Sequence, residues 1–146
     1  EAKGGNPNKF KFPRSLLGPD SLEFSFSGLK TSLLYFMDKF TEDENNLKKD
    51  VIASYQQAIV ETLIEKVRRA VIKTNVDTIV IAGGVAANQC LREKINADIK
   101  DVKIIFPDLK FCTNNAAMIS FLGEQKLKLG FNQTLNFSAL PNLKLS

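Results

Sequence analysis

Residues 78–88, with the sequence TIVIAGGVAAN, decide the fold. The first five are mostly β-branched and lie between Asp77 and Gly83, which is the composition of a buried parallel strand. Gly83 and Gly84 then let the backbone turn sharply. A helix is predicted to follow, from about Ala86 to Ala97. A strand that turns through two glycines into a helix is typical of an α/β domain.

The same order of elements continues downstream, where residues 102–106 are predicted to form a second strand that ends at Pro107. A last helix is predicted from Asn114 to Leu129, with Gly130 as its C′ residue. Two strands are too few for a normal doubly wound sheet, since parallel strands need neighbours and covered faces. Either the N-terminal segment supplies further strands, or a portion of the protein outside these residues builds the sheet. The second interpretation is favoured.

Upstream of the strand, apolar residues at helical spacing predict two helices. The first spans 29–40, with Ser27 as its N-cap. The second runs from Asp50, also as the cap, to about Lys73. Residues 1–26 contain three of the five prolines and are predicted to be an extended arm that wraps the surface or forms short edge strands. The chain therefore divides into an arm, 1–26, and an α/β portion, 27–146.

Composition excludes several kinds of chemistry. The 146 residues carry a net charge of +4, are 44% hydrophobic and include no histidine. A Ser-His-Asp or Cys-His nucleophile and the usual imidazole metal sites are therefore excluded within this chain. Cys90 and Cys112 form no metal-binding spacing and are expected to be buried free thiols. No apolar run is long enough for a membrane span and no leader is recognised, so a cytoplasmic location is expected.

The glycine turn is the first candidate site. The helix that follows it would direct unpaired N–H groups and a positive dipole at a phosphate or carboxylate. Asn88 can exchange hydrogen bonds with a ribose or base. A tight turn with no ligand explains the same residues equally well.

A second candidate is the segment FCTNNAAM, residues 111–118, which opens the last helix. Asn114 and Asn115 are by default ordinary capping residues. The functional interpretation places this helix beside the first, so that two dipoles converge on one anion.

Basic residues give two weaker candidates. Lys30 follows a segment that lacks the glycine and spacing of a Walker A site, so that site is rejected and a solvated lysine is favoured. A second set lies on or near the long helix and could face RNA. A solvated face is the favoured interpretation, since glutamates are interleaved. The set comprises Lys48, Lys49, Lys66, Arg68, Arg69 and Lys73.

Together these motifs resemble the C-terminal portion of the TsaD family, also called Gcp, the former O-sialoglycoprotein endopeptidase family. Four segments carry the resemblance in the family's order, and the arm sequence FKFPR, residues 10–14, also fits. The four are FSFSGLKT (24–31), ASYQQA (53–58), IAGGVAANQCLR (81–92) and CTNNAAMI (112–119).

The resemblance implies a helix-rich part of an ASKHA (actin-like, sugar-kinase-like) lobe with few parallel strands, the first lobe being missing. It also implies transfer of a threonylcarbamoyl group from threonylcarbamoyl-adenylate to N6 of the adenosine beside the anticodon of tRNA. TsaB- and TsaE-like proteins are the implied partners, and a homo- or heterodimer is a further expectation. Iron or zinc is the implied metal, expected to be absent from this chain alone.

Carried onto this sequence, the family's nucleotide-contacting asparagine falls on Asn88, beside Gly83 and Gly84. The family's metal-binding aspartate falls on Asn114, whose amide brings no charge and binds transition metals weakly. The chain alone is expected to be inactive, because it would supply only part of the cleft. Two alternatives remain: a non-catalytic homologue or structural subunit of the same complex, and an ATP-binding ASKHA-type module.

Overall fold

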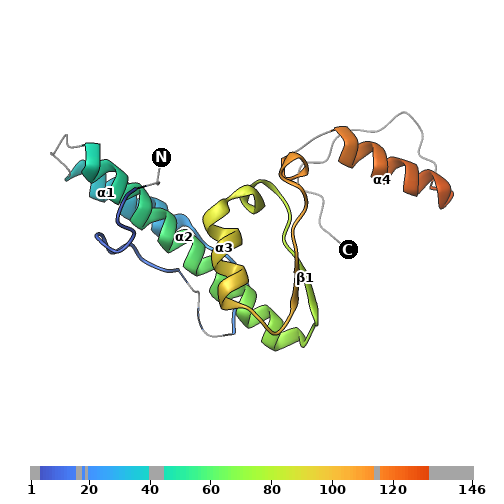
Figure 1. The fold of residues 1–146 in the computed structure, drawn as a ribbon, viewed down its shortest axis with the longest axis horizontal. Coiled ribbons are helices and arrows are strands. Elements are labelled where there is room, and N and C mark those ends of the chain that lie inside the picture. The colour runs from blue at the N-terminus through green and yellow to red at the C-terminus, as the bar shows by residue number, and fades with distance from the viewer. Residues whose placement is uncertain (1–3, 16–17, 19, 40–44, 114–115, 132–146) are drawn as a thin grey trace.

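The chain folds as a helix-rich α/β structure with two parallel strands (Figure 1). The computed structural model describes residues 4–15, 18, 20–39, 45–113 and 116–131. The helices are α1 (Ser27–Asp38), α2 (Asn45–Thr74), α3 (Gln89–Asp98) and α4 (Ala116–Lys128), the strands are β1 (Thr78–Val80) and β2 (Lys103–Ile105), and two 3₁₀ helices are η1 (Gly84–Ala87) and η2 (Leu109–Phe111).

Helix α2 is the spine of the molecule, because each half of it packs on a different hydrophobic cluster. Its C-terminal half joins α3 and the sheet around the buried residues Val60, Ile64, Leu91, Ile95 and Ile99. Its N-terminal half joins α1 and the arm around Phe12, Leu29, Val51 and Ala58. Burial of these side chains supplies most of the stabilisation of such a long helix.

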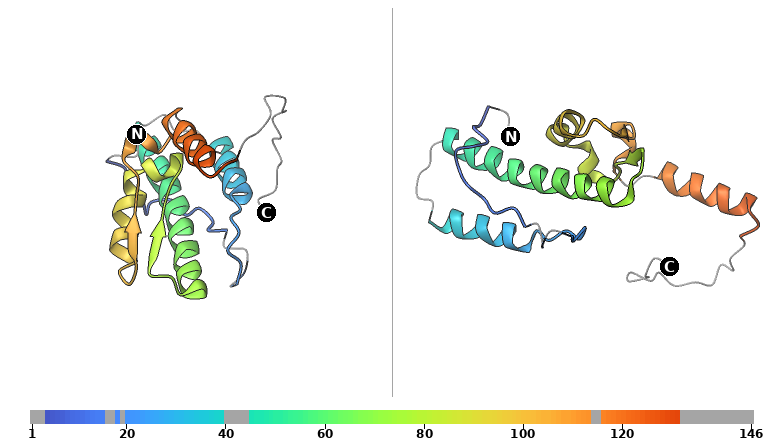
Figure 2. Two further views of the ribbon diagram at one scale, coloured as in Figure 1. Left: turned by 90° about the vertical axis from the view of Figure 1, so that its right-hand side faces the viewer. Right: turned by 90° about the horizontal axis from the view of Figure 1, so that it is seen from below.

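The two strands pair in parallel, as the sequence predicts, and Ile79 lies opposite Ile104. The prediction that the first strand is buried is wrong for the part of the chain that the structure describes. Ile104 packs against the α2–α3 cluster, but Val80 is 66% exposed. Successive strand residues face opposite sides, and helices α2 and α3 pack on one side of the sheet only (Figure 2).

The arm lies extended along α2, and its described residues contain no strand (Figure 2). Backbone groups of the arm bond to side chains of the helix. The Phe10 N–H donates to Ser54 Oγ at 3.2 Å, and Lys66 Nζ donates to the Ser21 carbonyl at 2.6 Å. Phe12 is buried between Phe36 and Tyr55. The described part of the arm is therefore an extended segment packed on α1 and α2, without an edge strand.

Two predicted helix caps are wrong. Helix α1 begins at Ser27 itself, and Phe26 occupies the cap position without a side-chain hydrogen bond. Helix α2 begins at Asn45, so Asp50 lies inside it. The Asp50 carboxylate instead accepts the Asn6 N–H at 2.6 Å and Lys9 Nζ at 2.8 Å. A residue with strong capping propensity is used here to hold the arm.

The C-terminal cap of α4 is confirmed. Gly130 has φ of +81°, and its N–H donates to the Leu127 carbonyl at 3.0 Å while Phe131 N–H donates to Lys126 at 3.0 Å. This pair of bonds is the Schellman motif. The helix begins at Ala116. Its predicted start at Asn114 and Asn115 lies outside the described residues.

Both cysteines are free thiols, with Cys112 buried and Cys90 half-buried. Among the described residues, no helix combines the length and the apolar character needed to cross a membrane.

Candidate nucleotide-binding turn

The glycine turn leaves the C-terminal end of β1 and faces open space. Gly83 has φ of +85° and ψ of 176°, a backbone conformation that is essentially restricted to glycine. A Cβ placed on Gly83 or Gly84 would meet no atom within 4 Å. Gly83 is therefore required by the backbone, whereas Gly84 leaves free the surface that a ligand would approach.

The helix after the turn starts later than predicted. Residues 84–87 form the 3₁₀ helix η1, and α3 begins at Gln89 rather than near Ala86. Asn88 is the N-cap of α3, and its Oδ1 accepts the Leu91 N–H at 3.0 Å. The side chain is half-buried. Its oxygen therefore serves the cap, and its amide nitrogen is the group that can donate to a ligand.

Arg92 joins the two candidate motifs, a role that the sequence analysis missed. Its Nε donates to the Ala86 carbonyl at 2.6 Å, and its Nη2 donates to the Pro107 carbonyl at 2.8 Å. Nη2 also lies 3.3 Å from Cys112 Sγ. The guanidinium carbon sits 4.7 Å from the centre of the Phe106 ring. The end of IAGGVAANQCLR is thus bonded to the start of the second motif.

The second motif is only partly described. Cys112 is buried beside Arg92, but Asn114 lies outside the described residues. Helix α4 has no buried residue and extends away from α3 (Figure 1). The structure gives Asn114 no position relative to the glycine turn, so convergence of the two helix dipoles stays a prediction.

Other predicted residues lie away from the turn. Lys30 is exposed on α1, and Lys66 is 1% exposed and bonded to the arm. Over the described ranges, no three His, Cys, Asp or Glu side chains come together to hold a metal. The described donors therefore do not fit iron or zinc.

A chain of polar contacts connects the arm, α2 and α3. Lys94 Nζ donates to Gln57 Oε1 at 2.5 Å, and Gln57 Nε2 donates to Glu61. Arg14 Nε and Nη2 donate to Glu61 Oε2 at 2.8 and 2.6 Å. Burial, the largest single influence, raises the pKa of Glu61. The bonds from Arg14 and Gln57 and the charges of Arg14 and Lys94 outweigh it, so the pKa is lowered from 4.5.

Comparison with known proteins identifies the family of this chain. A sequence model of the TsaD family, described as tRNA N6-adenosine threonylcarbamoyltransferase, matches residues 1–121. The chain belongs to this family.

Proteins named tRNA N6-adenosine threonylcarbamoyltransferase from three organisms match almost the whole chain. The one from Thermosipho africanus is 47% identical over 99% of this chain and 44% of its own length. The one from Fervidobacterium nodosum is 44% identical over 97% of the chain and 43% of its length. The one from Clostridium kluyveri is 44% identical over 99% of the chain and 43% of its own length. The chain thus spans less than half the length of these relatives.

Proposed function

We propose that this chain forms the C-terminal, ASKHA-type part of a tRNA threonylcarbamoyladenosine transferase and that it is inactive alone. The observation that carries the proposal is the match of nearly the whole chain to proteins named for that activity. The one-sided, two-stranded sheet supports it, because such a sheet leaves a face for more of the fold to cover.

In this proposal the glycine turn binds the adenylate portion of the donor. Gly84 leaves room for the phosphate, and the amide nitrogen of Asn88 donates to the ribose or base. The tRNA adenosine N6 attacks the carbonyl carbon of the threonylcarbamoyl group. The bond from that carbon to the phosphate oxygen breaks, N6 loses one proton to solvent, and AMP leaves with the electron pair.

The turn acts on the departing phosphate. Negative charge grows on the phosphate oxygen as its bond to the carbonyl carbon breaks. Fixed N–H dipoles stabilise this growing charge more than they stabilise the charge of the intact donor. Iron or zinc belongs, in this proposal, to the complete protein, with Asn114 at the position of one ligand. No described donor set fits the metal, so no step is assigned to it. Partners are TsaB- and TsaE-like proteins.

A chimera tests this proposal. The matched segment of the Thermosipho africanus relative is replaced by this chain, and modified adenosine in tRNA is measured by mass spectrometry. We expect the chimera to modify tRNA and this chain alone not to do so. A folded chimera without activity would overturn the proposal.

A second candidate, a non-catalytic structural subunit, is favoured by Asn114 alone, because its amide carries no charge and binds transition metals weakly. Asn114→Asp in the same chimera separates the two. If Asn114→Asp raises tRNA modification from background to the level of the relative, the result supports the hypothesis that the natural chain is a non-catalytic subunit. Equal activity with Asn114 and with the Asn114→Asp variant would contradict that hypothesis. Tight ATP binding by the isolated chain in calorimetry would instead favour the ATP-binding module.

A further inference from the structure

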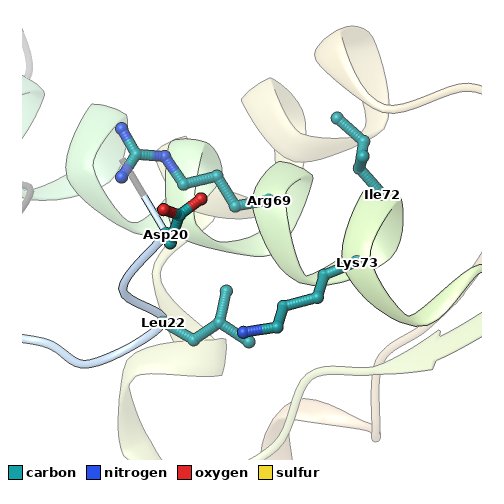
Figure 3. Close-up of a pocket in the computed structure, with 5 residues that line it drawn as sticks. All are labelled: Asp20, Leu22, Arg69, Ile72 and Lys73. Atoms are coloured by element: carbon teal, nitrogen blue, oxygen red, sulfur yellow. The ribbon is translucent and has the colours of Figure 1, made fainter. Parts of the chain in front are cut away.

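A cleft lies between the arm and the C-terminal end of α2, and no residue of the glycine turn lines it. Its volume is about 330 Å³, within the range of small-ligand sites. Asp20 and Leu22 line it from the arm, and Arg69, Ile72 and Lys73 line it from α2 (Figure 3). The proposed function assigns no role to this cleft.

The cleft holds two cations of different character. Arg69 is fixed, because its Nε donates to Glu65 Oε1 at 3.0 Å and its Nη1 to the Gly18 carbonyl at 2.5 Å. Lys73 is exposed, and no hydrogen bond or ion pair joins it to any described residue. A fixed guanidinium and an adaptable ammonium on the same side of a cleft suit a phosphate group.

The other lining groups narrow the class of ligand. Ile72, 74% exposed, and Leu22 both line the cleft, and each offers an apolar contact to a flat ring. The exposed Asp20 carboxylate repels a bare anion but accepts a hydrogen bond from an amino group. A phosphate, an apolar ring and an amino group occur together in a nucleotide.

A purely structural explanation covers only part of the cleft. Cations near the end of a helix are favoured by its dipole, which accounts for Arg69 and Lys73 close to Thr74. The dipole does not account for the exposed Ile72 or for the Asp20 carboxylate, which lines the same cleft near Arg69 (Figure 3). We therefore propose that this cleft binds one nucleotide of an RNA strand, its phosphodiester on Arg69 and Lys73 and its base on Leu22 and Ile72. The inference rests on the proposed function, since that function makes tRNA the substrate.

The test measures RNA binding by the 146-residue chain without any catalysis. The probe is a fluorescein-labelled single-stranded RNA of about 12 nucleotides, followed by anisotropy over a salt series. The test variant is Lys73→Glu. Its matched control is Lys49→Glu, an exposed lysine on the same helix about 36 Å away at the helical rise, so both variants change the net charge equally.

We expect Lys73→Glu to weaken RNA binding by about tenfold and to lower the slope of log K against log salt by about one. Lys49→Glu should stay within about twofold of the natural chain. Unchanged urea midpoints for both variants show that the fold is retained. AMP should displace the RNA at concentrations where inorganic phosphate does not, because phosphate lacks the base.

Three results would overturn the inference: no RNA binding by the natural chain, equal weakening by both variants, or displacement by inorganic phosphate as effective as by AMP. The last result defines a general anion site. None of them touches the proposed function, which the chimera tests through tRNA modification. If the chimera is inactive but Lys73→Glu specifically weakens RNA binding, the proposed RNA site is supported and the proposed transferase function is overturned.

Discussion

Arg92 is the single residue on which the geometry of the candidate site depends most. Its guanidinium bonds to η1, to Pro107 after β2 and to Cys112, and it lies over the Phe106 ring. A lysine ammonium cannot reproduce several directed bonds and a stacked plane at once. The local arrangement of the two motifs should therefore fail when Arg92 is replaced by lysine.

Arg92→Lys should lower the free energy of unfolding by about 1–3 kcal/mol, measured by urea denaturation. The buried Cys112 thiol should also react faster with a thiol reagent in a Cys90→Ser background. Arg68→Lys is the control, because Arg68 is exposed and pairs with Glu65 on the helix surface. Equal stability of the two lysine variants would contradict the role given to Arg92.

Alanine substitutions at the two glycines of the turn should distinguish a requirement for a glycine backbone conformation from a requirement for space for the ligand. Gly83→Ala should destabilise the chain by about 1–3 kcal/mol, because alanine is strained at this φ and ψ. Gly84→Ala should leave stability within about 0.5 kcal/mol, since its Cβ meets open space. In the chimera, however, that same Cβ should weaken donor binding. Urea denaturation and donor titration distinguish the two, and a stable Gly83→Ala variant would contradict the assignment.

At the scale of elements, the carboxylates of Asp50 and Glu61 join α2 to the arm, and that of Glu65 pairs with arginines within α2. The pKa of Asp50 is lowered by the hydrogen bonds from Lys9 and Asn6. The pKa of Glu65 is lowered mainly by the bond from Arg69, and that of Glu61 is lowered as described above. Each group binds protons less tightly in the folded chain than in the unfolded chain. Their stabilisation is therefore complete above about pH 4.5 and is lost as the pH falls through the folded pKa values.

We expect the urea midpoint to decrease as the pH is lowered from 6 to about 3. The decrease should be smaller in Glu61→Gln, which has one fewer group to protonate. Glu124→Gln on α4 makes the same charge change away from the arm and should leave the pH dependence unchanged. NMR titration should place the Asp50 midpoint below 3.8. A midpoint at or above this value would show that the arm is not bonded to Asp50.

Periodicity and turn chemistry predicted most of the elements, because the residues that specify them are close in the chain. The long helix, both parallel strands and the Gly130 cap follow from local patterns. The use of Asp50 and the bridging role of Arg92 depend on partners 44 and up to 20 residues away, and local patterns do not encode such pairings. Asn88 shows the same limit at the site, since its sequence position indicated a ligand contact and its oxygen in the structure caps α3.

At the scale of the whole molecule, the distribution of apolar surface matches a chain that spans less than half the length of its relatives. Ile119 and Phe121 on α4 are 69% and 65% exposed, and Val80 on the sheet is 66% exposed. Exposed apolar side chains of this kind are what we expect where another part of a protein covers the surface. The transferase activity is accordingly proposed for the complete protein.

The central claim is that the amide of Asn88 binds the donor, and Asn88→Ser in the chimera tests it most directly. Serine keeps an oxygen to cap α3, so the urea midpoint should not change, but it has no amide group. Binding of a non-hydrolysable threonylcarbamoyl-adenylate analogue, measured by calorimetry, should weaken by about tenfold, the loss expected for one hydrogen bond left unmade in the site. Gln89→Ala, the exposed neighbour, should bind like the parent chimera. Parental affinity in Asn88→Ser would contradict the account.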